Sequence, residues 1–144
     1  MIVADTTILV YAVGGDHHLR DPARALLRLA QHGELALTTT IDVVQEFLHV
    51  RARRRPREDA VALANAYALG LAPLLRPDEA DLEQALDLYL AHEQLGAFDA
   101  VLAAATRRRG WALASADEAF VHVEDLVVLD ASSATFLDRA KASR

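Results

Sequence analysis

Cysteine is missing from this sequence of 144 residues. Its absence excludes disulfide bonds, zinc sites built on thiolates and thiol nucleophiles, and it is typical of proteins in a reducing cytoplasm. Long apolar runs are missing too, because none approaches the ~20 residues that cross a bilayer. The chain starts MIVAD, without the basic first region of a secretory signal, and its apolar run stops at Asp5. We therefore expect a soluble, cytoplasmic protein that does not enter the membrane.

Internal repeats, low-complexity tracts and Gly/Ser-rich linkers do not occur in the chain. A length of 144 residues fits one domain around one core. Hydrophobic residues make up 53% of the sequence, which is enough to fold without covalent cross-links. We therefore predict a single domain over residues 1–144.

Positive charge is scarce, since 15 lysines and arginines face 21 acidic residues and the net charge is −6. Proteins that wrap a polyanionic backbone are usually basic, so the overall charge argues mildly against a general nucleic-acid binder. Two arginine clusters can nevertheless contact phosphates locally. The predicted RNA-binding residues are Arg51, Arg53, Arg54, Arg55, Arg107 and Arg108. The alternative for each cluster is a solvated helix end that the helix dipole favours.

Short apolar runs separated by longer helical segments organise the chain. The predicted strands are residues 1–5, 35–38, 111–114 and 126–129, with 72–75 as a weaker candidate. Their continuous apolar character is typical of a parallel sheet covered on both faces. The predicted helices are residues 20–32, 40–54, 57–70, 78–93, 98–109 and a last one near 132–141. This alternation predicts an α/β sandwich around a mostly parallel, five-stranded sheet.

Several polar side chains lie where such a sheet places its working residues, at the carboxyl ends of the strands. Asp5 ends the first strand, and Ser115 and Asp117 follow the strand over residues 111–114. Asp99 opens a helix, and Glu46 lies within one. The sequence therefore points to these acids as candidate site residues.

Each acid also has an ordinary structural interpretation. An aspartate within an apolar run, like Asp5, is costly to bury unless a partner such as Thr6 or Thr7 supports it, or it caps a helix over residues 6–12. Glu46 shares a helix face with apolar neighbours, and it either points inward or reaches water at the edge of that face.

The two later acids are ambiguous in the same way. Asp99 lies where a helix starts, and aspartate is favoured there as a cap. Asp117 follows a strand in a loop, where it fits either a cap or a site acid that Ser115 orients. Taken singly, neither residue identifies a functional site.

Together the four acids form a set of oxygen ligands without any required histidine or cysteine. Oxygen ligands select hard cations such as Mg²⁺ or Mn²⁺. Crowded carboxylates raise one another's pKa, and a divalent cation relieves that repulsion. Such a site can activate water against a phosphodiester and stabilise the leaving oxygen.

The order and spacing of four short motifs resemble the PIN-domain ribonucleases, and specifically the VapC toxin family, over nearly the whole chain. The matching segments are Ile2-Val3-Ala4-Asp5-Thr6-Thr7, Gln45-Glu46-Phe47, Phe98-Asp99-Ala100 and Ser115-Ala116-Asp117-Glu118-Ala119-Phe120. The resemblance implies a PIN-like three-layer sandwich. It also implies a toxin of a type II toxin–antitoxin module.

The resemblance further implies roles for individual residues. Asp5, Glu46, Asp99 and Asp117 would form the acidic pocket that binds Mg²⁺ or Mn²⁺, with Thr6 and Ser115 bracing the carboxylates. The reaction would be endonucleolytic hydrolysis of RNA that leaves a 5′-phosphate and a 3′-hydroxyl. Family members are usually homodimers silenced by a cognate VapB-type antitoxin, which often directs a basic side chain towards the acids. The last acidic position varies in the family, so Glu118 is an alternative to Asp117 there.

Three other classes of protein share part of this pattern. Haloacid-dehalogenase-like phosphatases need a second aspartate two residues after the first, where this chain has Thr7. Helical di-iron proteins need two Glu-x-x-His pairs, and Glu46 with His49 supplies only one. The third class is a non-catalytic protein-interaction module, whose partner face would be the Ala-rich segments 57–70 and 78–93. This becomes the main interpretation of the sequence if the side chains of the four acids do not lie close together.

Overall fold

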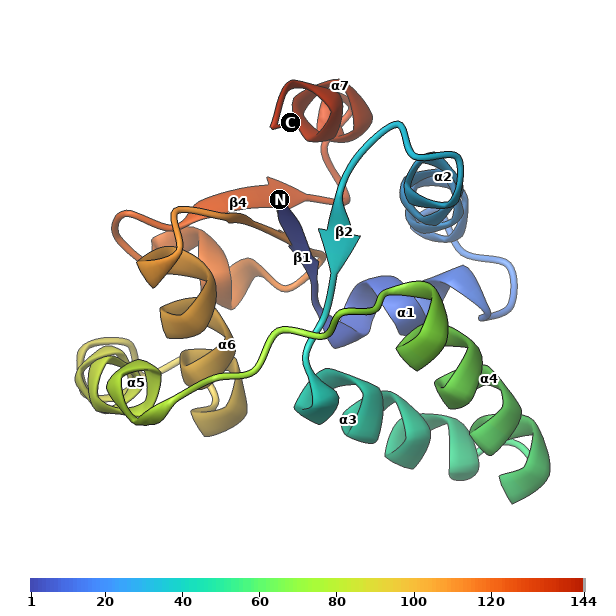
Figure 1. Ribbon diagram of the computed structural model, residues 1–144, viewed down its shortest axis with the longest axis horizontal. Helices are drawn as coiled ribbons and strands as arrows, with labels where there is room; N and C mark the ends of the chain where they lie inside the picture. Colours follow the sequence, from blue (N-terminus) through green and yellow to red (C-terminus); the bar gives the residue numbers. More distant parts are fainter. Residues whose placement is uncertain (144) are drawn as a thin grey trace.

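A parallel sheet lies at the centre of the computed structural model, which describes residues 1–143 (Figure 1). Its strands are β1 (Ile2–Ala4), β2 (Leu37–Thr38), β3 (Ala112–Ser115) and β4 (Val127–Asp130). They lie in the order β2-β1-β3-β4, and every neighbouring pair is parallel. The central strands β1 and β3 are buried along their whole length, which explains their continuous apolar sequences.

The fifth strand predicted over residues 72–75 is wrong. Within the described residues this segment makes a single isolated bridge, between Thr40 and Leu75, and the Leu75 amide donates to the Thr39 carbonyl at 2.9 Å. Pro73 has no amide hydrogen to donate, so the segment cannot continue a ladder. Its carbonyl accepts instead from the Thr38 hydroxyl at 2.8 Å, which fastens the segment beside the end of β2.

Seven α-helices and one 3₁₀-helix are present in the described residues. They are α1 (Thr6–Ala12), α2 (Arg20–Gln31), α3 (Ile41–Ala52), α4 (Arg57–Gly70), α5 (Glu79–Ala91), α6 (Ala97–Arg108), η1 (Glu118–His122) and α7 (Phe136–Ala142). Helices α2 to α6 begin within one residue of the predicted starts, whereas α7 begins at Phe136 rather than near residue 132. None of the helices described in residues 1–143 is both long and apolar enough to cross a membrane.

The connections between strands place helices on both faces of the sheet. Crossovers between parallel strands are almost always right-handed. The chain steps from β1 to β2 in one direction and returns across β1 to β3 in the other, so α1 and α2 lie on the opposite face from α6. Figure 1 shows α5 and α6 to one side of the sheet and α1 and α2 to the other, and α7 packs against α2. The predicted three-layer α/β architecture is confirmed, with four strands rather than five.

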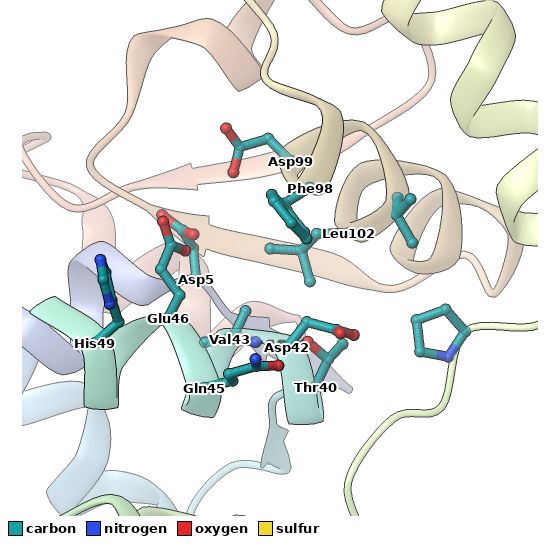
Figure 2. A pocket seen from close by; sticks show the side chains of 12 residues that line it. Asp5, Thr40, Asp42, Val43, Gln45, Glu46, His49, Phe98, Asp99 and Leu102 are labelled. Carbon is teal, nitrogen blue, oxygen red and sulfur yellow. Dashed lines mark hydrogen bonds between the residues drawn. The ribbon is translucent and has the colours of Figure 1, made fainter.

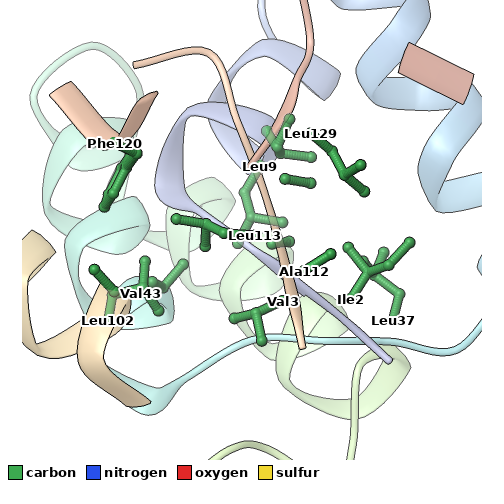
Figure 3. Close-up of a cluster of buried hydrophobic side chains, with 14 of the residues drawn as sticks. Ile2, Val3, Leu9, Leu37, Val43, Leu102, Ala112, Leu113, Phe120 and Leu129 are labelled. Carbon is green, nitrogen blue, oxygen red and sulfur yellow. The ribbon is translucent and has the colours of Figure 1, made fainter. Parts of the chain in front are cut away.

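The core is built where these layers meet (Figure 3). Leu9 of α1, Leu113 of β3 and Leu129 of β4 are all fully buried in this apolar cluster. Val43 of α3 and Leu102 of α6 lie beside each other at one edge of the same apolar cluster. The inner faces of α3 and α6 are therefore fixed by burial, and the polar residues next to these two side chains are held in place with them.

A buried carboxylate joins the start of α5 to the end of α6. The Asp81 side chain is fully buried and accepts hydrogen bonds from Arg108 and from Arg109, the latter at 3.0 Å from each of its oxygens. It also accepts from the backbone amide of Asp78 at 2.9 Å, while Asp78 Oδ1 accepts from the Asp81 amide, which completes a capping box. Two arginines thus satisfy one buried charge and fix the helix pair.

The sheet topology creates a crevice at the carboxyl ends of β1 and β3. The connection that leaves β1 leads towards β2, whereas the connection that leaves β3 leads towards β4. Adjacent parallel strands whose connections diverge in this way leave an opening between the two loops, and α/β proteins bind their ligands there. The residues that follow these two strands, Asp5 and Ala116, therefore lie at the natural binding position of this fold.

Candidate active site

Three of the four predicted acids line one cavity of about 490 Å³. Asp5 follows β1, Glu46 lies on α3 and Asp99 lies on the first turn of α6. Figure 2 shows Asp5 and Glu46 side by side, with Asp99 across from them. Asp117 completes the group electrostatically, because it contributes to raising the pKa of Asp99. The structure therefore brings together acids that are far apart in the sequence.

Asp5 combines the two roles that its sequence context left open. It is 3% exposed and is the N-cap of α1. Its Oδ2 accepts from the Ser115 hydroxyl at 2.7 Å, from the Thr7 hydroxyl at 2.8 Å and from the Thr7 amide at 3.4 Å. Burial raises the pKa of Asp5, and the bonds from Ser115 and Thr7 oppose that rise. Because these bonds all end on Oδ2, the other oxygen is left for a ligand in the cavity.

The threonine that supports Asp5 is Thr7, while Thr6 supports a different acid. The Thr6 hydroxyl donates to Glu46 Oε2 at 2.5 Å and so links α1 to α3. Thr7 is the second residue of α1, and it is the amide at this position that an N-cap side chain accepts from. The start of a helix after Asp5 was therefore the feature of the sequence that indicated a hydrogen bond from Thr7 to Asp5. Ser115, which we expected to brace a carboxylate, donates a hydrogen bond to Asp5.

Ser115 also connects Asp5 to Asp117. The Ser115 hydroxyl donates to Asp5 and accepts from the Asp117 amide at 2.9 Å. Asp117 is the N-cap of η1 and its Oδ1 accepts from the Ala119 amide at 2.9 Å. Its carboxylate is exposed, unlike that of Asp5. The capping role considered for Asp117 is thus observed, and it holds the side chain at the edge of the acidic group.

Asp99 is the acid whose pKa is raised by the charges of the other three as well as by burial. It lies on the third residue of α6, after the N-cap Gly96. Burial, together with the charges of Asp5, Glu46 and Asp117, raises its pKa to about 6, and a hydrogen bond from the Gly96 backbone opposes the rise. A Cβ atom on Gly96 would lie 2.9 Å from Asp99 Oδ2, so glycine leaves room for this carboxylate. Repulsion of this kind is what a bound cation relieves.

The acids suit a hard divalent cation by their chemistry. The functional atoms on the acidic side are carboxylate oxygens, which Mg²⁺ and Mn²⁺ prefer. Among residues 1–143, no three histidine, aspartate or glutamate side chains form a ready-made ligand cage. Mg²⁺ does not need one, because it keeps several waters and is usually bound through one or two carboxylates. After burial, the charges of Asp5, Glu46 and Asp117 contribute to the raised pKa of Asp99, so the residues fit such an ion.

Comparison with known proteins agrees with this geometry. A family model described as the PIN domain matches residues 2–126. Ribonuclease VapC7 of Mycobacterium tuberculosis is 47% identical over 129 residues, which are 88% of this chain and 89% of that protein. The chain belongs to the PIN domain family, in its VapC branch. Ribonuclease VapC23 of Mycobacterium tuberculosis is 34% identical to this PIN domain over 113 residues, 76% of the chain and 86% of the relative.

Solved structures share the fold of this PIN domain at low sequence identity. VapBC2 of Rickettsia felis, bound to a DNA fragment from its promoter, superposes with a TM-score of 0.70 at 17% identity and covers 90% of this chain and 98% of that one. FitAcB of Neisseria gonorrhoeae superposes with a TM-score of 0.67 at 18% identity and covers 91% and 98%. The overall fold is therefore one that solved structures share.

The two arginine clusters of the PIN domain occupy different environments. Arg107 donates to the Gln84 side chain and the Glu124 carbonyl, and Arg108 donates to Asp78 and Asp81. These guanidinium groups are already engaged within the protein. The other cluster follows α3, the helix that carries Glu46. The exposed residues in that cluster are Arg53, Arg54 and Arg55.

Arg51 of that second cluster has partners of its own. It donates to Asp59 at 2.6 Å and to the Val13 carbonyl at 3.2 Å, which joins α3 to α4 and to the end of α1. Arg54 and Arg55 line a smaller cavity of about 190 Å³. The exposed members of this cluster are therefore better placed for contact with RNA phosphates than Arg51, Arg107 or Arg108.

Several cavity residues of the PIN domain were not singled out as site residues by the sequence. Asp42 and His49 lie one turn before and one turn after Glu46 on α3, so helical spacing places all three on one face. Gln45 and Phe98 also line the cavity, and each is the direct neighbour of a site acid. The sequence did carry weak signals for them, because Asp42 and His49 are spaced one turn from Glu46 while Gln45 and Phe98 belong to the motifs around the acids.

Proposed function

We propose that this PIN domain is a metal-dependent endoribonuclease and the toxin component of a type II toxin–antitoxin module. The observation that carries the proposal is the meeting of Asp5, Glu46 and Asp99 in one cavity at the diverging ends of β1 and β3. The names of the VapC relatives support ribonuclease activity. The position two residues after Asp5 is Thr7, whose hydroxyl binds Asp5, so the second acid of a haloacid-dehalogenase-like phosphatase is missing.

The side chains divide the chemical work between them. Asp5, Glu46, Asp99 and Asp117 would hold Mg²⁺ or Mn²⁺, which supplies the positive charge that stabilises charge developing on a phosphodiester. The hydrogen bonds from Ser115 and Thr7 fix the Asp5 carboxylate beside the cavity and oppose the rise in its pKa that burial causes. Thr6 fixes the carboxylate of Glu46. Carboxylates held in this way can orient a water molecule for in-line attack on RNA, leaving a 5′-phosphate and a 3′-hydroxyl.

A protein partner follows from the same charge pattern. We propose that a VapB-type antitoxin silences the site by directing a basic side chain to the acids, because four carboxylates attract a guanidinium strongly. We also propose a homodimer. Helix α5 exposes Leu82, Leu86 and Leu90, spaced four residues apart on one face, and Leu90 is 81% exposed. An apolar stripe of this kind is typical of an interface between copies.

RNA contacts outside the cavity complete the proposal. Arg53, Arg54 and Arg55 follow the helix that carries Glu46 and are exposed. A strand of RNA that enters the acidic cavity therefore has phosphate-binding side chains available beyond it. We assign this role to the cluster after α3, with Arg51 fixing its position through Asp59.

Removal of divalent cations should abolish RNA cleavage. Purified protein is incubated with a mixture of single-stranded RNAs in Mg²⁺ or Mn²⁺, and then with excess EDTA. Cleavage should occur with the metal, stop with EDTA and return when Mg²⁺ is restored, because the carboxylates alone repel a phosphodiester. Sequencing of the products should find 5′-phosphates and 3′-hydroxyls. Cleavage that persists in EDTA would show that the acids act without a cation and would contradict the proposal.

The two neighbouring acids Asp117 and Glu118 should differ in their effect on cleavage. Asp117, and not Glu118, is among the charges that raise the pKa of Asp99. Asp117→Asn preserves the acceptor for the Ala119 amide and should lower kcat/KM about tenfold or more, the effect of losing a supporting ligand. Glu118→Gln should change it less than about twofold. Equal losses in the two variants, measured on one RNA substrate, would assign the role to both residues.

A further inference from the structure

The cavity that contains the acids has a second, apolar end. Its apolar lining consists of Val43 on α3, Pro77 before α5, and Phe98, Val101 and Leu102 on α6. Figure 2 shows Phe98 and Leu102 on α6 facing Val43 and Asp42 on α3. Hydrolysis of a phosphodiester needs only the acidic end. The apolar end is therefore not explained by the chemistry proposed for the carboxylates.

Phe98 is the most unusual side chain of this apolar end. It is 80% exposed although it lines the cavity, and it is the residue directly before Asp99. Leaving an aromatic ring in water forgoes the free energy of burying it. Leu102 lies one turn further along α6 and Val101 lies between them on the same side, so the ring continues an apolar surface that reaches into the core. Such a ring is available to cover the flat face of a ligand.

Polar groups are placed at the same end of the cavity. Thr40, Asp42 and Gln45 come from the first turns of α3 and line it together with the apolar residues. The Gln45 amide can donate and accept, and the Asp42 carboxylate accepts. Groups of this kind recognise the hydrogen-bonding edge of a nucleobase. An aromatic ring beside two such side chains is the combination with which proteins bind unpaired bases.

We propose that the apolar end is a subsite for an unpaired nucleobase of the RNA, stacked on Phe98 and adjoining the phosphate that is cleaved. The inference rests on the proposed ribonuclease function and goes beyond it by assigning the place of one base of the RNA, on the exposed ring of Phe98. The acidic end and the apolar end belong to one continuous cavity. Because Phe98 and Asp99 are consecutive, a base on the ring brings its attached phosphate to the acidic end. Stacking on an aromatic side chain is the common means of holding single-stranded RNA.

A second copy of the chain is the competing occupant. The apolar stripe formed by Leu82, Leu86 and Leu90 lies on α5, whereas Phe98 lines the cavity beside Asp99. A dimer built on the α5 stripe does not need the Phe98 ring. The base subsite and the interface proposed above are therefore separable by mutation.

The test removes either the base or the ring. A single-stranded RNA that wild-type protein cleaves at one position is compared with versions carrying one abasic nucleotide next to that position on either side. One abasic version should be cleaved with a kcat/KM about 5- to 150-fold lower, the range expected for the loss of one base–aromatic stack. Phe98→Ala should lower kcat/KM on the intact RNA by a similar factor and should be almost insensitive to the same abasic change. Phe98→Trp should retain cleavage.

Binding without cleavage separates this inference from the nuclease proposal. Phe98→Trp in a Trp111→Phe background has one tryptophan, and its fluorescence is measured in EDTA as RNA is added. Intact RNA should quench it and abasic RNA should quench it less. Quenching without any cleavage in Mg²⁺ would overturn the nuclease proposal and leave the subsite standing. Full activity of Phe98→Ala, or no quenching, would overturn the subsite, as would a smaller oligomer of Phe98→Ala in sedimentation, which would place the ring at an interface.

Discussion

Asp99→Asn should lower the rate of RNA cleavage about a thousandfold and at the same time stabilise the metal-free protein. The loss of activity follows because Asp99 is the acid on which the charges of Asp5, Glu46 and Asp117 converge. Removing one preorganised group from such a site typically lowers the rate by two to three orders of magnitude or more. The substitution preserves the size of the side chain and leaves the neighbouring core unchanged. The loss of activity therefore measures the effect of removing the charge of Asp99.

The gain in stability follows from the raised pKa of Asp99. Its pKa is about 6 in the folded protein, above the ordinary value of 3.8. The folded protein therefore binds this proton more tightly than the unfolded chain, and the free energy of unfolding falls as pH rises from about 4 to about 6. Above that range the wild-type protein carries the full penalty of the ionised, crowded carboxylate. Asparagine has no charge, so the variant does not lose this stability.

Thermal unfolding in EDTA measures the effect. At pH 7.5 the Asp99→Asn variant should be more stable by about 1 kcal/mol, a value reduced to allow for the partial solvent exposure of the side chain. That corresponds to a Tm higher by roughly 2–4 °C. At pH 4 the difference should vanish. Asp87→Asn, on an exposed position of α5, serves as the matched control and should change neither property. An inactive variant that is less stable at pH 7.5 would contradict the electrostatic explanation.

Asp81→Ala should lower the free energy of unfolding by about 3 kcal/mol, the largest loss of stability expected from a single change outside the core. The variant leaves Arg108 and Arg109 without their shared buried partner. Breaking one side of a buried ion pair is costly because Arg108 and Arg109, whose side chains are only 28% and 25% exposed, lose their fully buried partner. The hydrogen bond from the Asp78 amide to the Asp81 side chain, one half of the capping box of α5, is lost at the same time. For a chain of this length the Tm should fall by roughly 6–12 °C.

Chemical denaturation of two variants tests this role. Glu83→Ala removes an exposed acid from the same helix and should change the free energy of unfolding by less than about 0.5 kcal/mol. Asp81→Ala should retain cleavage at temperatures where it is folded, since Asp81 does not line the acidic cavity. A loss below about 1 kcal/mol for Asp81→Ala would mean that the arginines find other partners, and the network would then not hold α5 to α6.

The sequence predicted the sheet well where burial dictates the residues. Ile2, Val3 and Leu113 lie in continuous apolar runs because the central strands are covered on both faces. The same pattern failed over residues 72–75. An apolar run looks alike whether or not its amides meet a neighbouring strand, and Pro73 removes one of those amides. Hydropathy describes burial, whereas a strand also requires a complete set of hydrogen-bond partners.

The site was predictable to a different degree for each acid. Adjacent parallel strands bring their carboxyl ends together, so the meeting of Asp5 and Asp117 follows from the strand assignment. Glu46 and Asp99 lie on helices, and their orientation depends on how α3 and α6 pack, which spacing along the chain does not determine. Only the likeness to the PIN family placed them in the site.

The supporting residues show where local rules were sufficient and where they were not. Thr7, as second residue of a helix capped by Asp5, follows from capping geometry once that helix is accepted. The bond from Thr6 to Glu46 joins two helices 40 positions apart and could not be read from either segment. The exposure of Phe98 was equally hidden, because an aromatic residue in a helix is ordinarily assigned to the core.

The position of β3 in the sheet has a consequence for how the protein is made. β3 lies between β1 and β4, and Ser115 at its end holds Asp5, yet these two residues are 110 positions apart in the sequence. A ribosome therefore has to synthesise the chain through β3 before the carboxylates can be assembled. A nascent chain that is still being translated has Asp5 and Glu46 but lacks the strand that fixes the first of them. The proposed active site is thus incomplete on a nascent chain until β3 has been made and has joined the sheet.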